Sequence, residues 1–229
     1  MREISQENTA PRQGKGKHKL VQGIGINDLS TPINEYRYYT ERGERKREVL
    51  WVCKIYVTWK GMLARCYCPK TQDRQPTYRN CSVCEEWLLF SNFREWVVSQ
   101  DWEGKALDKD ILIKNNKVYS PESCVLIDRL VNSFITENCT RRGDCLIGAT
   151  RREYSDKVTK YEATCRNPIT KDKDYLGGFD TELEAHLSWR QRKSEMVDLL
   201  KRNGYLPDHL VYSALKIRYS ATGDYYDFK

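Results

Sequence analysis

The chain has no long apolar run, and this absence excludes several classes of protein. No segment approaches the roughly 20 consecutive apolar residues that a membrane-spanning helix needs, and residues 1–5 lack the apolar core of a signal peptide. Charged residues make up 31% of the sequence, and the mean hydropathy is -0.75. We therefore expect a soluble protein that has no membrane partner and is located in the cytoplasm.

Acidic residues are in the minority. The 39 Lys and Arg residues outnumber the 32 Asp and Glu residues, which gives a net charge of +7. This excess favours a polyanionic partner, because each Lys or Arg that docks on a phosphate releases condensed counterions. Residues 1–20 combine basic side chains with almost no apolar ones. We predict that they form a flexible basic arm; the alternative is a solvated tail without a partner.

The cysteines cannot all be paired with one another, because their number, nine, is odd. A cytoplasmic chain is also expected to keep its thiols reduced. The spacing of Cys81 and Cys84 lets two thiolates hold one Zn²⁺, and Cys66 (or Cys68) with Cys124 would complete a tetrahedral structural site. The alternative is that these cysteines are small buried hydrophobic side chains.

Residues 107–112 predict a strand that carries the carboxylate of Asp108, followed by a polar turn. A second apolar run over residues 124–127 leads towards Asn132 on a predicted helix. A carboxylate at the base of a hairpin, facing an oxygen on a helix, can hold one divalent cation against a phosphate. Alternatively, Asp108 satisfies the amides of the turn.

This layout, together with Trp59-x-x-Met62-x-x-Arg65 and the Cys84-Glu85-Glu86-Trp87 segment, resembles the HNH nucleases that phages encode as free-standing homing endonucleases. The resemblance covers roughly residues 50–135. It implies a ββα-metal module that hydrolyses DNA phosphodiester bonds with Mg²⁺ or Mn²⁺ held by Asp108 and Asn132, and no small-molecule cofactor. For a phage-encoded chain, the cytoplasm is that of the host cell.

The signature departs from the family at two positions. The family places a general-base His directly after the metal-binding Asp, whereas this chain has Lys109, and Ser123 stands where the family has Asn. A Lys must be shifted several units below its usual pKa of about 10.4 before it accepts a proton. Asp110 could instead orient a water, or a metal-bound hydroxide could act without a protein base. The catalytic candidates are Asp108, Lys109, Asp110, Ser123 and Asn132.

Three strands are predicted after residue 145, over residues 146–154, 160–167 and 173–179. A long amphipathic helix follows, from a capping box at Thr181 and Glu184 to a stop at residues 203–204. A last short helix is predicted to start at residues 207–208.

The segments around Ile147-Gly148-Ala149 and residues 175–181 resemble the Apetala/ethylene-response-factor DNA-binding domain, which also occurs fused to phage HNH nucleases. In that family the sheet lies in the major groove of double-stranded DNA. The resemblance implies the DNA-facing residues Thr150, Arg152, Tyr154, Thr164, Arg166, Lys173 and Tyr175. The alternative is a solvated outer face of the sheet.

The sequence as a whole predicts an α+β fold: a ββα-metal, HNH-like module followed by a three-stranded antiparallel sheet packed on one long helix. The predicted divisions are a basic arm at 1–20, the nuclease-like module at 21–138, the Apetala-like domain at 139–203, and a terminal helix and tail at 204–229. The predicted function is a DNA endonuclease of the homing type. The alternative is a catalytically inactive, sequence-specific DNA-binding protein with a regulatory or anti-defence role.

Overall fold

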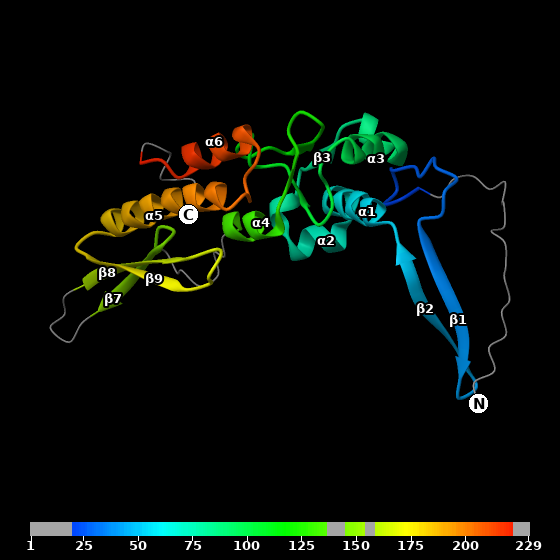
Figure 1. Cartoon of the computed structure of the whole chain (residues 1–229), viewed down its shortest axis with the longest axis horizontal. Helices are drawn as coiled ribbons and strands as arrows, with labels where there is room; N and C mark the ends of the chain where they lie inside the picture. Colours follow the sequence, from blue (N-terminus) through cyan, green and yellow to red (C-terminus); the bar gives the residue numbers. More distant parts are fainter. Residues whose placement is uncertain (1–19, 137–144, 154–158, 222–229) are drawn as a thin grey trace. The chain divides into compact units, whose positions relative to one another are not determined.

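The computed structural model describes residues 20–136, 145–153 and 159–221 (Figure 1). The chain divides into two compact units, Met1–Asp101 with Lys117–Glu122, and Trp102–Asn116 with Ser123–Lys229. The predicted basic arm lies, except for residue 20, outside the described residues. Within the described ranges, no helix has the length and apolar content to cross a membrane.

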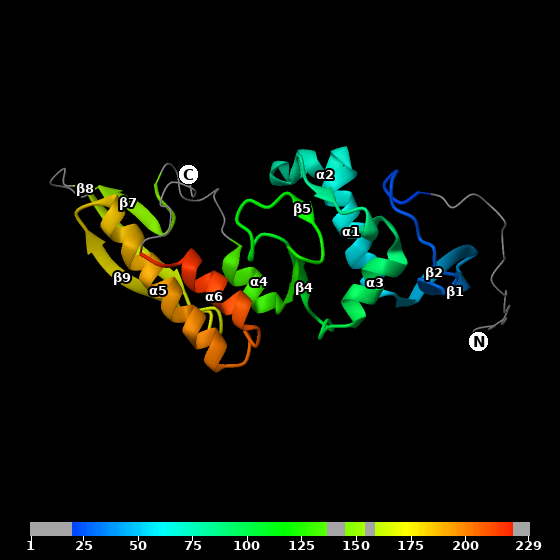
Figure 2. The same ribbon diagram turned by 90° about the horizontal axis from the view of Figure 1, so that it is seen from above.

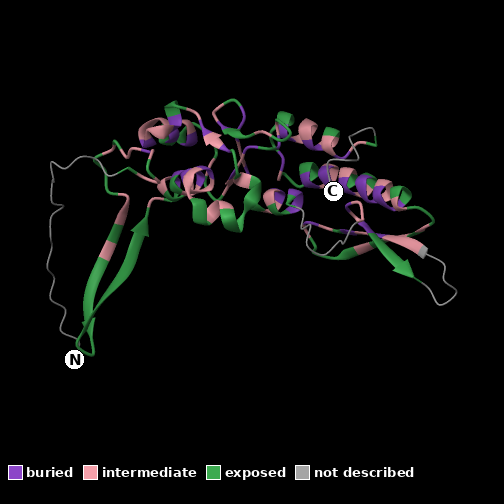
Figure 3. Cartoon of the chain, turned by 180° about the vertical axis from the view of Figure 1, so that it is seen from behind, coloured by how far each residue is buried: buried purple, intermediate pink, exposed green. Residues whose placement is uncertain are grey.

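The first unit begins with a two-stranded antiparallel ribbon of β1 (Asn34–Glu41) and β2 (Glu44–Val52). Arg42 and Gly43 form its turn with φ of 53° and 80°, as a two-residue hairpin turn requires. No residue of either strand is buried, and Figures 1 and 3 show the ribbon extending away from α1 with exposed residues along both strands. This hairpin is not among the elements expected from the sequence.

The rest of the first unit is small and mainly helical. Its elements are α1 (Lys54–Tyr67), α2 (Pro69–Arg74), η1 (Pro76–Tyr78), β3 (Ser82–Val83), η2 (Glu86–Leu88), α3 (Phe90–Val98) and β5 (Val118–Tyr119), with β3 and β5 paired in parallel. Its core is aromatic, and Trp59, Trp87 and Phe93 are almost completely buried. The indole Nε1 of Trp59 donates to the carbonyl oxygen of Trp87 at 2.7 Å, which satisfies the buried polar atom.

The second unit combines a strand pair, a three-stranded sheet and three helices. Its elements are β4 (Ala106–Asp108), β6 (Val125–Ile127), α4 (Arg129–Ile135), β7 (Ala149–Glu153), β8 (Thr159–Arg166), β9 (Lys173–Phe179), α5 (Glu182–Arg202) and α6 (His209–Arg218). Strands β4 and β6 are antiparallel, and the sheet has the antiparallel order β7-β8-β9. Figures 1 and 2 show α5 lying across one face of the sheet. The predicted α+β class and the three-stranded sheet with its long helix are confirmed.

Both predicted helix starts in the second unit are confirmed. The hydroxyl of Thr181 accepts from the Glu184 amide at 3.2 Å, and the Glu184 carboxylate accepts from the Thr181 amide at 3.1 Å, which completes the capping box of α5. At α6, the side chain of Asp208 accepts from the Leu210 amide at 2.7 Å. Each cap pairs amides that a helix N-terminus leaves without an internal partner.

A single apolar core joins the β4–β6 pair and α4 to the C-terminal elements. Ile111, Ile127 and Val131 belong to the same buried cluster as Trp189 of α5 and Leu215 of α6. Two three-residue strands and a seven-residue helix have too little surface to bury a core alone. The units therefore divide at residues 101–102 and around the 117–122 segment, which differs from the predicted domain boundary at 138–139.

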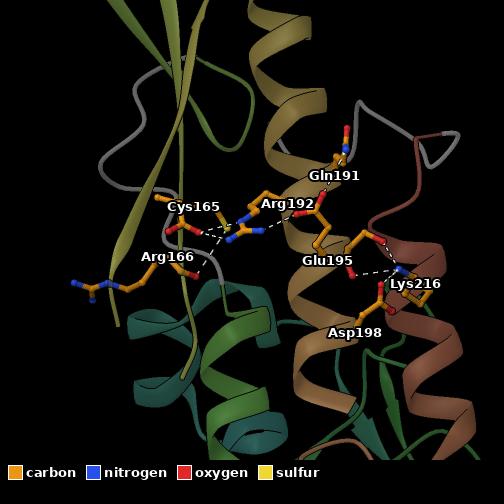
Figure 4. A network of polar contacts seen from close by, with 9 residues as sticks. Cys165, Arg166, Gln191, Arg192, Glu195, Asp198 and Lys216 are labelled. Carbon is orange, nitrogen blue, oxygen red and sulfur yellow. Dashed lines mark hydrogen bonds and ion pairs between the residues drawn. The ribbon is translucent and has the colours of Figure 1, made fainter. Parts of the chain in front are cut away.

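Polar contacts fix the sheet and α6 on opposite sides of α5 (Figure 4). Arg192 of α5 donates to one carboxylate oxygen of Asp174 in β9, through Nε at 2.9 Å and Nη2 at 2.8 Å. Lys216 of α6 reaches Asp198 of α5 at 2.9 Å. These contacts hold β9 in a fixed orientation on the helix, so the opposite face of the sheet is presented outwards.

Candidate functional site

Asp108 ends strand β4 and is engaged with its own turn. Its Oδ1 accepts from the amides of Asp110 at 2.8 Å and Ile111 at 2.9 Å. Burial raises the pKa of the Asp108 carboxyl, while these two amide hydrogen bonds act in the opposite direction. Oδ2 accepts no hydrogen bond from the described residues, so one carboxylate oxygen is left for a ligand. Asp108 therefore satisfies the amides of its turn through Oδ1, and Oδ2 could still bind a metal ion.

The side chain of Lys109 is bound within the loop of residues 109–116. It is only 5% exposed, and its Nζ lies 2.5 Å from Oδ1 of Asp110 and 2.6 Å from the carbonyl oxygen of Asn116. The side chain of Asn116 donates back to the Lys109 carbonyl oxygen at 2.9 Å. These contacts tie the side chain of Lys109 to both ends of the loop. This arrangement favours a structural role for Lys109 over that of a general base. It also places Asp110, the other candidate for orienting a water, in an ion pair with Lys109.

Asn132 lies on α4, which packs against β4, so the strand pair and the helix that carry Asp108 and Asn132 are neighbours. Asn132 is half-buried, and its backbone continues the helix from the N-cap Asp128. Asp108 and Asn132 share no hydrogen bond in the described chain. Ser123 is buried at the start of the segment that leads into β6. The structure therefore brings these residues onto adjacent elements without forming a closed polar site.

The proposed zinc ligands come from both units of the chain. Cys81 and Cys84 flank β3, and Cys66 lies near the end of α1; all three belong to the first unit, whereas Cys124 belongs to the second. Burial raises the pKa of the Cys84 thiol to about 11, which keeps it protonated near neutral pH unless a metal displaces the proton. In the part of the chain that the structure describes, no three His, Cys, Asp or Glu side chains converge on a point where they could hold a metal ion. The zinc site stays a prediction.

The β7–β8–β9 sheet has an inner face of small residues and an outer polar face. Ala149 and Ala163 pair across β7 and β8 and pack with Ala185 of α5. Asp174 of β9 also lies on the inner face, since it binds Arg192. Alternation along the strands therefore turns the neighbours of these residues outwards.

Six of the seven predicted DNA-facing residues share this outer face: Thr150, Arg152, Thr164, Arg166, Lys173 and Tyr175. Register pairs Arg166 with Lys173 and Thr164 with Tyr175, and Tyr175 is 64% exposed. Arg152 Nε donates to Glu162 on the same face at 3.0 Å. The seventh residue, Tyr154, lies outside the described residues.

Sequence reasoning missed the exposed residues of the β1–β2 ribbon. The signal was present as the Arg42-Gly43 turn between a Tyr-rich run at residues 34–41 and a run at residues 44–52 that ends in four apolar residues. Comparison with protein-family models finds no match to this chain, and searches among curated proteins and among solved structures find none either. Functional inference therefore depends on the residues and their geometry.

Proposed function

We propose that the protein binds double-stranded DNA through the outer face of the β7–β8–β9 sheet. The observation that carries this proposal is the placement of Arg166, Lys173 and Tyr175 side by side, exposed, on the face opposite α5. Counting charges on this face, the four cations Arg152, Lys160, Arg166 and Lys173 stand against Glu162 and against Asp180, which pairs with Lys160, so 4 - 2 = +2. A rigid sheet with an excess of cations suits the major groove, where Arg reads guanine edges and Lys binds phosphate.

The test measures affinity of the purified full chain for duplexes selected from a random-sequence pool. Arg166→Ala and Lys173→Ala should each weaken binding by about 1–3 kcal/mol where they contact base edges. Where they contact phosphates, each should reduce the salt slope by about 0.9. Arg202→Ala is the matched control, because Arg202 is an exposed cation of the same unit at the end of α5. Equal affinities for the wild type and both sheet variants would refute the proposal.

A second candidate function is metal-dependent hydrolysis of DNA near Asp108. It is favoured by the antiparallel β4–β6 pair with α4 packed on β4 and by the unengaged Oδ2 of Asp108. Asp108 and Asn132 would hold a Mg²⁺ or Mn²⁺ ion, and two protein ligands suit Mg²⁺, which keeps several waters and binds phosphate oxygens. When bound, the ion would supply an acidified water and stabilise charge on the phosphate.

The chain's own residues would divide the remaining work. Lys109 holds Asp110 and the Asn116 carbonyl, so its role would be to shape the loop. Incubation with supercoiled plasmid and Mn²⁺ should produce nicks with the wild type and none with Asp108→Asn, which retains an acceptor for the two amides. A wild type that binds DNA and leaves it uncut in Mg²⁺ and Mn²⁺ would favour the alternative function, a DNA-binding protein without catalysis.

A further inference from the structure

The β1–β2 ribbon has two chemically different faces. Cross-strand register places six side chains on one of them, which we call the tyrosine–arginine face: Tyr36, Tyr38, Thr40, Arg45, Arg47 and Val49. The guanidinium of Arg47 lies 4.3 Å from the centre of the Tyr36 ring, and that of Arg45 lies 4.7 Å from the Tyr38 ring. The two cations are thus held over aromatic rings in a short ladder along the ribbon.

The opposite face carries every carboxylate of the ribbon: Glu35, Glu41, Glu44 and Glu48. There Lys46 lies 2.6 Å from Glu41, and Arg37 lies 3.6 Å from Glu48. The charge on this face is 2 - 4 = -2, whereas the tyrosine–arginine face has two cations and no anion. Sequence composition hides this segregation, because the charges of the two faces sum to zero when they are counted together.

We propose that the tyrosine–arginine face of the ribbon binds duplex DNA as a second contact surface, in addition to the β7–β8–β9 sheet. The inference rests on the proposed DNA partner. A guanidinium stacked on a ring keeps its N–H donors at the edge of the stack, where they can reach phosphate oxygens or base edges. Neither Arg45 nor Arg47 has a carboxylate partner within the described ranges, so a phosphate would be their first anionic contact.

The dimensions of the ribbon agree with this partner. A two-stranded ribbon fits the major groove of B-DNA, which is about 12 Å wide. At roughly 3.4 Å per residue, a strand of eight residues is about 27 Å long and can follow several base pairs. Tyr38 is 53% exposed, which leaves its ring accessible to sugar and base edges. The negative opposite face would be directed away from the DNA.

The decisive comparison uses two double variants of the full chain that lose the same charge. Arg45→Gln with Arg47→Gln removes the cations of the tyrosine–arginine face, and Arg37→Gln with Lys46→Gln removes those of the opposite face. The first should lower affinity for a selected duplex about tenfold and reduce the salt slope by about 2, and the second should change affinity less than about twofold. Equal losses in both variants would overturn the inference.

A cross-linking measurement on the wild type avoids any dependence on variant folding. Duplex DNA that carries 5-iododeoxyuridine should cross-link to Tyr36 or Tyr38 on irradiation, as identified by mass spectrometry. Cross-links confined to the second unit would contradict the inference. A ribbon variant that alters the monomer–dimer equilibrium in light scattering, while leaving DNA affinity unchanged, would assign this face to a second copy of the chain and would also overturn it.

The two proposals fail in different ways. If the wild type binds no duplex at all, the proposed function fails, and the ribbon inference falls with it. Suppose instead that the wild type binds DNA and that Arg166→Ala and Lys173→Ala weaken this binding. If the two ribbon double variants then have equal affinities for DNA, only the ribbon inference fails. A ribbon variant that weakens binding when both sheet variants do not would leave DNA binding in place and move it to the ribbon.

Discussion

The outer face of the sheet and the loop that begins at Asp108 belong to the same unit and are supported by the same apolar core, yet they use their polar side chains differently. On the sheet, Arg166 and Lys173 form no ion pair with a described residue. In the loop, the side chains of Asp108 and Lys109 are bonded to groups of the loop itself. A side chain that is already satisfied must exchange an internal contact for a ligand. For this reason we propose DNA binding ahead of catalysis.

The largest expected effect comes from disrupting the core that the two regions share. Gly148 has φ of +82°, and a Cβ there would lie 2.1 Å from Cγ of Trp189. Gly148→Ala should therefore lower the free energy of unfolding by about 3 kcal/mol or more, because backbone strain adds to overpacking. Urea denaturation measures the loss. Gly43→Ala is the control: its φ is +80° with no atom within 4 Å, so only strain of about 1 kcal/mol is expected.

Hydrogen exchange extends this test to the comparison itself. Because Trp189 shares its cluster with Ile111 and Ile127, the sheet and the Asp108 loop should lose protection together in Gly148→Ala. Faster exchange in the sheet with unchanged protection of β4 and β6 would show that the two regions are not supported by one core.

A smaller effect is expected from removing the cation that closes the loop. Lys109→Met leaves the Asn116 carbonyl and the Asp110 carboxylate without their partner, and we expect a loss of about 1–3 kcal/mol in unfolding free energy. The lower part of that range reflects Asp110, which is 48% exposed and can be hydrated. Lys173→Met on the sheet should stay within about 0.5 kcal/mol of the wild type. Equal unfolding free energies for the two variants would show that the contacts of Lys109 stabilise the fold no more than the exposed side chain of Lys173 does.

The third effect depends on pH. Burial raises the pKa of Asp108, so the folded state binds its proton more tightly than the unfolded state does. The contribution of Asp108 to stability should therefore fall as pH rises through the interval between its unfolded and folded pKa values, and stay flat above it. Asp108→Asn keeps an oxygen acceptor and lacks this charge, so it should equal or exceed the wild type by up to about 1 kcal/mol near pH 7. The difference should shrink as pH falls to the unfolded value of about 3.9.

Thermal unfolding with and without Mn²⁺ completes this test. A divalent ion bound at Asp108 stabilises the ionised carboxylate, so Mn²⁺ should raise the melting temperature of the wild type and leave that of Asp108→Asn unchanged. Equal shifts in both proteins would place any bound metal elsewhere. The sign derived from burial would be wrong if the free energy of unfolding rose more steeply with pH in the wild type than in Asp108→Asn over the acidic range.

The parts of the fold that follow from local sequence signals were the predictable ones. The capping box at Thr181 and Glu184 and the N-cap at Asp208 satisfy backbone groups within three residues of themselves, so the sequence alone specifies them. The alternation of Ala163, Thr164 and Cys165 likewise indicates which side of β8 faces a helix.

What the sequence does not reveal depends on contacts between distant residues or on the absence of a core. The ribbon has no buried side, so its strands lack the apolar alternation by which a strand is recognised, and the Arg42-Gly43 turn is the main signal that the sequence offers for it. The common core of Ile111, Ile127 and Trp189 joins segments more than 60 residues apart. The position of Lys109 directly after Asp108 makes it a candidate base in the sequence. Its actual partner, the Asn116 carbonyl, is a backbone atom that no side-chain pattern identifies.

The smallest expected effect concerns a single carboxylate on the outer face of the sheet. Glu162 binds Arg152 at 3.0 Å and is itself 23% exposed, so it both engages a cation and presents a negative charge to an approaching phosphate. Glu162→Gln removes the repulsion and loosens the hold on Arg152. We expect an increase of about threefold in affinity for duplex DNA at low salt, declining as salt screens the interaction. Glu195→Gln, on α5, is the control and should change affinity little. If Glu162→Gln instead weakens binding, the ion pair with Glu162 positions Arg152 for its contact with DNA. The charged side chains of the outer face would then be held in place by one another before DNA binds.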